Sequence, residues 1–427
     1  MKEVKCPPED FRGTFSIRRY LCGGTDHMKL TLRYSITHFT HWAAGTAAVS
    51  FATLYLMNRG VSAGMAGTLL ALSGLLSCIS QPFLAAAADR AKKMVIVNML
   101  IGMSVICCLC FVLQLIPGLP VLATGIFYMV GIWSSDAMVP ILNALSVAYQ
   151  EAGYEINYGM GRGVGAVASA VSALGVGVII AKFGTVWMIL FLLFFRAAGI
   201  FALIGYPKIQ KNILKESGKA EKKAEKKAED SCTLLQFVKR YKWYCTSLLA
   251  ILFLGMFHAM TENYMIVIME KLGGDSSNVG VAIFIASMVA FPVICSFSFL
   301  YKRLKVTVIL KIAAVSFLAK SILFYFAGNV TAIYFIQLLQ ITSYAFLAPA
   351  QVYYANEKVN SSDMVKGQAF ITAAYALGCS AGNFAGGQLL PMGANAIMQA
   401  GIVMAAVGTG IMFLTVNQSD GILEKGI

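Results

Sequence analysis

The stretch "QPFLAAAADRAKK", Gln81–Lys93, joins two long apolar blocks of the chain. The block before it covers about 61–86 and the block after it about 94–115. Each block has roughly the 20 residues that a helix needs to cross a bilayer. The charged residues of the stretch therefore belong to a short turn between two membrane-spanning helices. An acid at a helix end with basic neighbours can form charge-assisted contacts with another helix.

The same apolar pattern continues through the chain. Of the 427 residues, 58% are hydrophobic and 13% are charged, whereas a soluble protein carries about 25% charged residues. The pattern predicts an all-α membrane protein with twelve transmembrane helices in two six-helix halves. The expected spans are about 34–57, 61–86, 94–115, 119–147, 158–181, 185–206, 243–270, 276–300, 306–327, 330–355, 364–389 and 394–416.

Lysine and arginine predict the orientation, because cytoplasmic loops are enriched in these residues. If both termini are cytoplasmic, the loops on the other side carry only Arg59, Lys182 and Lys271. We therefore expect a monomeric, multi-pass protein of a bacterial plasma membrane, with the lipid bilayer as its surroundings. This topology explains the net charge of +14, so the charge does not indicate a nucleic-acid partner.

A charged segment divides the chain. The low-complexity run "KESGKAEKKAEKKAEDS" follows the sixth expected span and is typical of a solvated tether. The glycine pair Gly60 and Gly67 has the same spacing as Gly273 and Gly280, which indicates a duplicated six-helix unit. The sequence therefore predicts five parts. They are a cytoplasmic N-terminal segment (1–33), a first six-helix bundle (34–206), a charged cytoplasmic linker (207–242), a second six-helix bundle (243–416) and a cytoplasmic tail (417–427).

Two motifs resemble those of a known family. Gln81–Lys93 resembles the loop between the second and third helices of the major facilitator superfamily, with alanines at two positions where that pattern has glycine. The resemblance implies the major facilitator fold and transport by alternating access. It also implies that the charged residues of this loop form a gate on the cytoplasmic side: Asp89, Arg90 and Lys93.

The second motif is "YGMGRGVGAV", Tyr158–Val167, at the start of the fifth expected span. It resembles the fifth helix of the oligosaccharide/proton symporter branch, the lactose-permease-like transporters. The resemblance implies that Arg162 binds sugar hydroxyl groups. In that branch an acid on the fourth helix pairs with this arginine, whereas this chain has Asn143 at the corresponding position. A charge that faces lipid is energetically costly, so a charge inside a membrane span is a candidate functional residue. The neighbouring glycines would let another helix approach closely and cover Arg162.

Polar residues on the fourth and first expected spans are further candidates. Trp133, Asp136 and Asn143 lie on one face of the fourth helix and can offer an indole, a carboxylate and an amide to a solute. Asp136 alternatively forms a structural hydrogen bond. His38 and His41 lie on one face of the first helix and are also expected to bind substrate.

The second half has its own set. His258 and Glu262 are four residues apart on the seventh helix, a spacing that suits proton coupling, with Asp136 as the second choice. A packed pair without a coupling role is the alternative. Arg196 most simply packs or extends to the membrane surface. The remaining expected substrate-binding residues are Lys320, Gln337, Gln340 and Tyr344.

Together these residues predict a secondary transporter for a small polar organic solute, a sugar or glycoside, moved with protons. Sodium coupling and uncoupled diffusion stay open. The alternatives are a transporter of an amphipathic or aromatic organic anion or drug, and a sensor that does not transport. No nucleophile, phosphate-loop or metal-ligand pattern is present, so we expect no enzymatic activity, no cofactor and no metal site.

Overall fold

The computed structural model describes residues 15–90, 94–152, 154–207, 234–360 and 363–418. Helices make up these residues, with short connections between them. The first group is α1 (Phe15–Ser50), α2 (Ala52–Asn58), α3 (Ala63–Arg90), α4 (Met94–Leu113), α5 (Val121–Glu151), α6 (Tyr158–Phe183) and α7 (Thr185–Ile204). The second group is α9 (Leu234–Arg240), α10 (Lys242–Asn263), α11 (Met265–Lys271), α12 (Ser276–Cys295), α13 (Phe297–Tyr301), α14 (Val306–Phe326), α15 (Val330–Ile336), α16 (Tyr344–Lys358), α17 (Met364–Leu389) and α18 (Ala394–Thr415).

All twelve expected spans are helical, which confirms the all-α prediction. Within the described residues, ten segments are long and apolar enough to cross a membrane. The expected spans at 34–57 and 364–389 are the two beyond these ten. Four expected spans are interrupted. Three of them consist of two consecutive helices, α1 and α2, α10 and α11, and α12 and α13, and the fourth consists of α15, a 3₁₀ segment (Gln337–Ile341) and α16.

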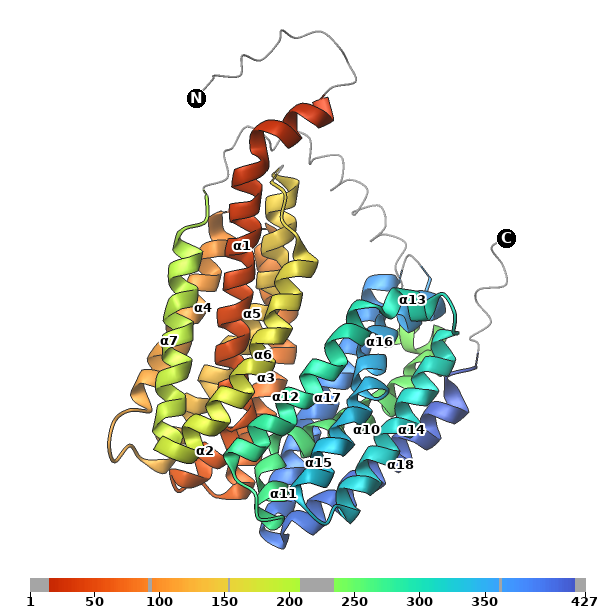
Figure 1. Cartoon of the computed structure of the whole chain (residues 1–427). Coiled ribbons are helices and arrows are strands. Elements are labelled where there is room, and N and C mark those ends of the chain that lie inside the picture. The colour runs from red at the N-terminus through yellow and green to blue at the C-terminus, as the bar shows by residue number, and fades with distance from the viewer. Residues whose placement is uncertain (1–14, 91–93, 153, 208–233, 361–362, 419–427) are drawn as a thin grey trace.

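The helices form two bundles (Figure 1). One contains α1–α7 and the other α10–α18, and the two converge at the end away from the chain termini and diverge toward the termini. Helix α9 lies in the segment that was expected to be the linker. Most of the linker, 208–233, and most of the N-terminal segment and C-terminal tail lie outside the described residues.

The two halves repeat a detail of backbone geometry. Helix α1 is interrupted at Phe51 (φ −115°, ψ 13°) and helix α10 at Tyr264 (φ −112°, ψ 15°), and each break is followed by a seven-residue helix. Each short helix then leads to a glycine with positive φ, Gly60 at 83° and Gly273 at 79°. This geometry is the physical counterpart of the glycine spacing seen in the sequence.

The bundles meet through backbone where side chains are small. A Cβ atom on Gly177 of α6 would lie 3.1 Å from the Cα of Gly280 in α12. The Ser276 hydroxyl at the start of α12 donates to the Gly177 carbonyl at 3.0 Å. Close approach of this kind is the usual role of small residues between membrane helices. These contacts join the halves at the end where the bundles converge.

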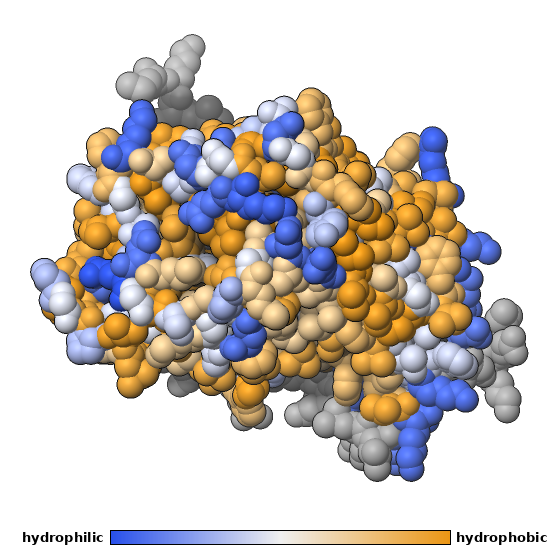
Figure 2. Space-filling model, turned by 90° about the horizontal axis from the view of Figure 1, so that it is seen from below, coloured by the Kyte–Doolittle hydropathy of each residue, from blue (hydrophilic) through white to orange (hydrophobic). Residues whose placement is uncertain are grey.

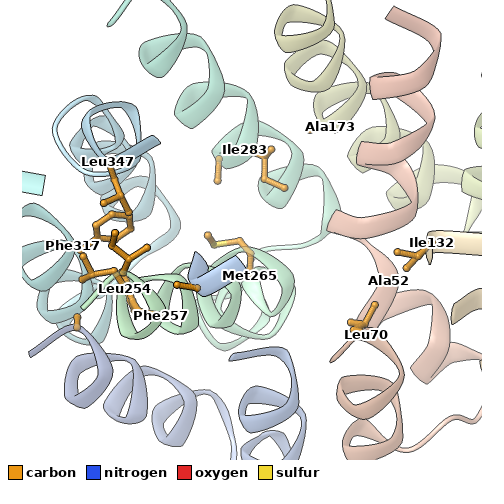
Figure 3. Packing of buried hydrophobic residues seen from close by; sticks show 14 of the residues in the cluster. Ala52, Leu70, Ile132, Ala173, Leu254, Phe257, Met265, Ile283, Phe317 and Leu347 are labelled. Atoms are coloured by element: carbon orange, nitrogen blue, oxygen red, sulfur yellow. The ribbon is translucent and has the colours of Figure 1, made fainter. Parts of the chain in front are cut away.

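Apolar side chains fill each half and also cover its outside. Phe257 of α10 and Phe317 of α14 pack edge to face inside the second half (Figure 3). Phe201, Phe326 and Leu414 are each more than 70% exposed, as expected for side chains that contact lipid. Figure 2 views the end away from the termini, where hydrophilic side chains gather in separate groups among hydrophobic ones.

Candidate functional site

The start of α6 is built so that rings of α1 can pack on its backbone. The Asn157 side chain accepts a hydrogen bond from the Met160 amide at 2.9 Å and caps the helix. A Cβ on Gly161 would lie 2.5 Å from the Tyr34 ring, and a Cβ on Gly165 would lie 2.5 Å from Trp42. Glycine is therefore required at both positions, and α1 is the helix that covers this region.

Arg162 lies between these glycines on α6. Its guanidinium carbon is 5.0 Å from the centre of the Trp42 ring, within the range of a cation–π interaction. The NH1 atom is buried without a hydrogen-bond partner. A Cβ on the adjacent Gly163 would lie 3.4 Å from the ring of Phe291 in α12, so the second half adjoins this turn of α6. One terminal nitrogen of the Arg162 guanidinium thus has no protein partner, in a region of α6 that lies beside the second half.

Two more polar groups of the first half are buried without partners. His38 has no exposed surface, packs edge to face with Tyr34 at 4.6 Å, and neither ring nitrogen has a hydrogen-bond partner. The amide oxygen of Asn143 is likewise buried and unpartnered. Unpaired buried polar atoms are costly, which suggests that a ligand or water completes their bonding.

Trp133 and Asp136, which were expected to share one face of the fourth span, have side chains that interact with different helices. The Trp133 indole donates to the Ser80 hydroxyl of α3 at 3.0 Å, so this ring nitrogen is already used within the first half. The Asp136 backbone carbonyl accepts a hydrogen bond from the Gln81 amide of α3 at 3.4 Å. The Asp136 carboxyl group is near enough to Arg196 of α7 for an electrostatic interaction. Among the described residues, no hydrogen bond or ion pair joins Asp136 to Arg162.

Arg196 is the residue whose environment the sequence did not reveal. It is 3% exposed and donates to the Ser135 hydroxyl at 2.6 Å, with its other terminal nitrogen 3.2 Å from His41 Nδ1. It neither extends to the surface nor merely packs, because these bonds join α7 to α5 and α1. The partners come from helices that are distant in sequence, so no local pattern announces them.

The second half has a break where the tenth span was expected to be one helix. After α15, residues Gln337–Ile341 form a short 3₁₀ segment, and α16 begins only at Tyr344. Such interruptions line binding sites in transporters, because they expose polar backbone and side-chain groups. Gln337 is fully buried and both of its amide atoms lack a partner.

Lys320 and Gln340 are brought together at this break. The Lys320 ammonium donates to the Gln340 amide oxygen at 2.6 Å, and Lys320 is 1% exposed. The charge of Glu262 acts on both Lys320 and His258. His258 stacks on Tyr344 with ring centres 5.0 Å apart and an angle of 6°. The predicted residues of the second half therefore form one cluster across α10, α14, the 3₁₀ segment and α16.

Some polar atoms of this cluster lack hydrogen-bond partners. One Glu262 carboxylate oxygen and His258 Nδ1 are buried without partners. No hydrogen bond between these two side chains is present in the described part of the chain. The spacing of four residues thus places them on one helix face without joining them directly.

The predicted gate lies at the end of α3. Asp89 and Arg90 end helix α3, but the positions of their side chains are outside what the structure describes, and Lys93 lies outside the described residues altogether.

An open pocket of about 900 Å³ lies elsewhere, beside the start of α6. It contains none of the predicted binding residues, and its lining is Thr31, Leu32, Gln150, Glu155, Ile156, Asn157, Tyr158 and Met160. Among the described residues, no group of three or more His, Cys, Asp or Glu side chains could hold a metal ion.

Comparison with solved structures supports this architecture. A mutant form of the nucleoside transporter NupG aligns with a TM-score of 0.72 at 13% identity, over 91% of this chain and 100% of that chain. A bacterial homolog of the human lysosomal transporter Spinster gives 0.63 at 14%, over 91% and 96%. A D-xylose–proton symporter gives 0.62 at 13%, over 91% and 97%. At such identities the likeness concerns the fold.

The sequence comparisons agree with the fold. No curated protein matches the chain. Residues 31–400, most of the chain, match the MFS_1 like family. The chain therefore belongs to the MFS_1 like family, and it is an integral multi-pass membrane protein with the fold of major facilitator transporters.

Proposed function

We propose that this protein is a secondary active transporter that moves a sugar or glycoside by alternating access, with proton symport. The observation that carries the proposal is a set of buried, unpartnered polar atoms contributed by both halves. These atoms belong to His38, Asn143, Arg162, Glu262 and Gln337. Transporters of this fold bind their substrates near the middle of the membrane between the halves.

The chemistry of this set suits a solute with many hydroxyl groups. A guanidinium offers several donors in a fixed plane, and amides both donate and accept. The Trp42 face beside Arg162 can carry a sugar ring. A nucleoside is itself a glycoside, and NupG, one of the structural neighbours, is a nucleoside transporter. The branch resemblance at Tyr158–Val167 supports the same class.

Proton coupling is assigned to Glu262 with His258. No aspartate or glutamate occurs between Asp275 and Glu357, so the eighth to tenth spans cannot supply a carboxylate. Glu262 lies in the cluster with the buried Lys320, so a change in its protonation would alter the charge balance there. Asp136 is the second choice, and sodium coupling or uncoupled diffusion are the other outcomes of the test.

A second candidate is transport of an amphipathic or aromatic organic anion. Lys320 favours it, because the hydrogen-bond partner of this buried cation is the neutral Gln340. The rings of His258, Tyr344 and Tyr375 lie within 6.4 Å of one another, measured between centres, and could hold an aromatic group. A sensor without transport is distinguished from both by the absence of flux.

The proposal includes an orientation. With both termini in the cytoplasm of a bacterium, the end where the bundles diverge faces the cytoplasm, and the structure corresponds to an inward-facing state. Asp89, Arg90 and Lys93 would then form the cytoplasmic gate of a monomer. The two bundles, 34–206 and 243–416, would move as the two bodies of alternating access.

A ligand panel tests the proposal. Purified protein is tested by thermal shift with uridine, D-xylose, methyl β-glucoside and benzoate, followed by uptake of radiolabelled compounds into proteoliposomes. Stabilisation and uptake with one of the hydroxylated compounds support the proposal. Binding of benzoate alone favours the anion transporter, and binding without uptake favours the sensor.

A further inference from the structure

Arg196 takes no part in the function proposed above, yet it is the most buried arginine among the described residues. It lies on α7 and is 3% exposed, inside the first bundle. Its Nε atom has no partner. A buried guanidinium that is only partly hydrogen-bonded weakens folding, so a stability role alone explains it poorly.

The hydrogen bonds of Arg196 determine which of its partner atoms act as acceptors. Its NH2 group donates to Ser135 Oγ at 2.6 Å and its NH1 group lies 3.2 Å from His41 Nδ1. A guanidinium has five donors and no acceptor. His41 Nδ1 must therefore be the acceptor in this pair.

This direction determines the protonation form of His41. An imidazolium carries hydrogen on both nitrogens and cannot accept a hydrogen bond. His41 beside Arg196 is thus neutral, and its single ring hydrogen resides on Nε2. The assignment follows from the partner, as it does for histidines oriented by a second group in other sites.

The Nε2 atom of His41 differs from the nitrogens of His38. Both His38 nitrogens are enclosed without partners, whereas His41 Nε2 is not among the enclosed, unpartnered atoms. No hydrogen bond to His41 Nε2 is present among the described residues either. Nε2–H is therefore a donor that remains in contact with accessible space.

We propose that Arg196 is a positioning residue that keeps His41 as the Nε2–H tautomer, so that His41 presents a fixed hydrogen-bond donor to an acceptor oxygen of the transported solute. The donor role rests on the proposed transport of a hydroxylated solute. Arg196 acts through His41 and does not touch the solute.

The tautomer is measured without reference to transport. The chain has four histidines, so the full-length protein labelled with ¹⁵N-histidine in lipid nanodiscs gives few signals, and His41→Gln identifies those of His41. We expect the wild type to show hydrogen on Nε2 alone. Arg196→Met, which keeps an unbranched apolar chain, should populate both tautomers. A wild-type signal with hydrogen on Nδ1 or on both nitrogens would overturn the assignment, whether or not the variant folds.

Ser135→Ala provides a matched control. It removes the hydroxyl that accepts from Arg196 NH2 and leaves the bond to His41, so the Nε2–H form should persist. Loss of the form in Ser135→Ala together with its persistence in Arg196→Met would assign the tautomer to a residue other than Arg196.

The donor role is tested by two substitutions of His41. The amide of asparagine stands at the δ position and can accept from Arg196, whereas that of glutamine reaches the ε position and can donate to the solute. For uridine and methyl β-glucoside uptake, His41→Asn should raise KM at least about tenfold more than His41→Gln, with similar kcat; tenfold corresponds to about 1.4 kcal/mol.

The opposite order would overturn the donor role and leave His41 as a structural partner of Arg196. If the wild type takes up neither compound, the proposed function and the donor role fail together for these solutes. The NMR measurement still decides whether Arg196 sets the tautomer, so the two failures are distinguishable.

Discussion

Gly67 of α3 and Gly387 of α17 meet backbone to backbone: a Cβ on Gly67 would lie 2.7 Å from the Cα of Gly387. The contact belongs to the end where the two bundles converge. Together with the approach of Gly177 to Gly280, it makes closure at that end depend on the absence of side chains. Membrane helices that approach this closely use small residues at the contact.

Gly67→Leu should hold the halves apart at this end and shift the protein away from the described state. We expect loss of net uptake, because one of the two alternating states can no longer close. Distances between spin labels on α3 and α17 would measure the change. Gly175→Leu on α6 is the control, since no atom lies within 4 Å of a Cβ at that position. Unchanged distances in Gly67→Leu would contradict the closure role.

Arg162→Lys should weaken solute binding by about 10- to 100-fold, because lysine keeps the charge but loses the planar fork over Trp42. Arg162→Ala should weaken it at least as much. Calorimetry with the compound that binds in the panel measures the effect. Arg303→Lys is a matched control, since Arg303 also lies over a ring, Phe299 at 4.3 Å, but on an exposed loop. Unaltered affinity in both Arg162 variants would remove Arg162 from the site.

Gly165→Ala should impair binding without touching the arginine. The new Cβ would lie 2.5 Å from the Trp42 ring, so the indole must move from its place below Arg162. Overpacking of this kind costs about 1–3 kcal/mol, and the melting temperature should fall as well. Gly159→Ala is the control, with its nearest neighbour at 3.5 Å. Equal affinities of the two variants would argue against a role of Trp42 in binding.

Lys320 and Glu262 should behave as a coupled pair. Removing either charge leaves the other unbalanced in a buried cluster, so Lys320→Met and Glu262→Gln should each lower the melting temperature. The double variant should recover part of the loss, with a coupling free energy of about 1 kcal/mol or more. Strictly additive losses in thermal unfolding would mean that the two groups do not interact.

Much of the fold was predictable because it depends on short-range patterns. Apolar runs of about 20 residues located every span, and the equal spacing of the pairs Gly60/Gly67 and Gly273/Gly280 indicated a duplicated unit, in which the structure then shows Gly60 and Gly273 with positive φ. The break at Gln337–Ile341 was not predictable, since its sequence suits a continuous helix. The interruption of the helix goes together with packing from other helices, including the hydrogen bond from Lys320 of α14 to Gln340.

The site was predictable as a set of residue types and less so as an arrangement. Arg162, Lys320 and His258 stood out because charged or titratable groups are rare in spans. Their neighbours come from other helices: Trp42 lies beside Arg162, and Ser80 takes up the Trp133 indole. The environment of Arg196 depends on residues 61 and 155 positions away, a relation that periodicity along one helix cannot reveal.

The most direct test of the central claim is proton movement coupled to solute in proteoliposomes that contain a pH-sensitive dye. Addition of the solute that binds in the panel should acidify the interior of vesicles containing wild-type protein. Glu262→Gln should abolish uphill uptake while exchange of labelled for unlabelled solute continues, because exchange needs no net proton transfer. Accumulation against a gradient by Glu262→Gln would show that Glu262 is not the carrier. Solute entry into wild-type vesicles without any acidification would contradict proton symport itself.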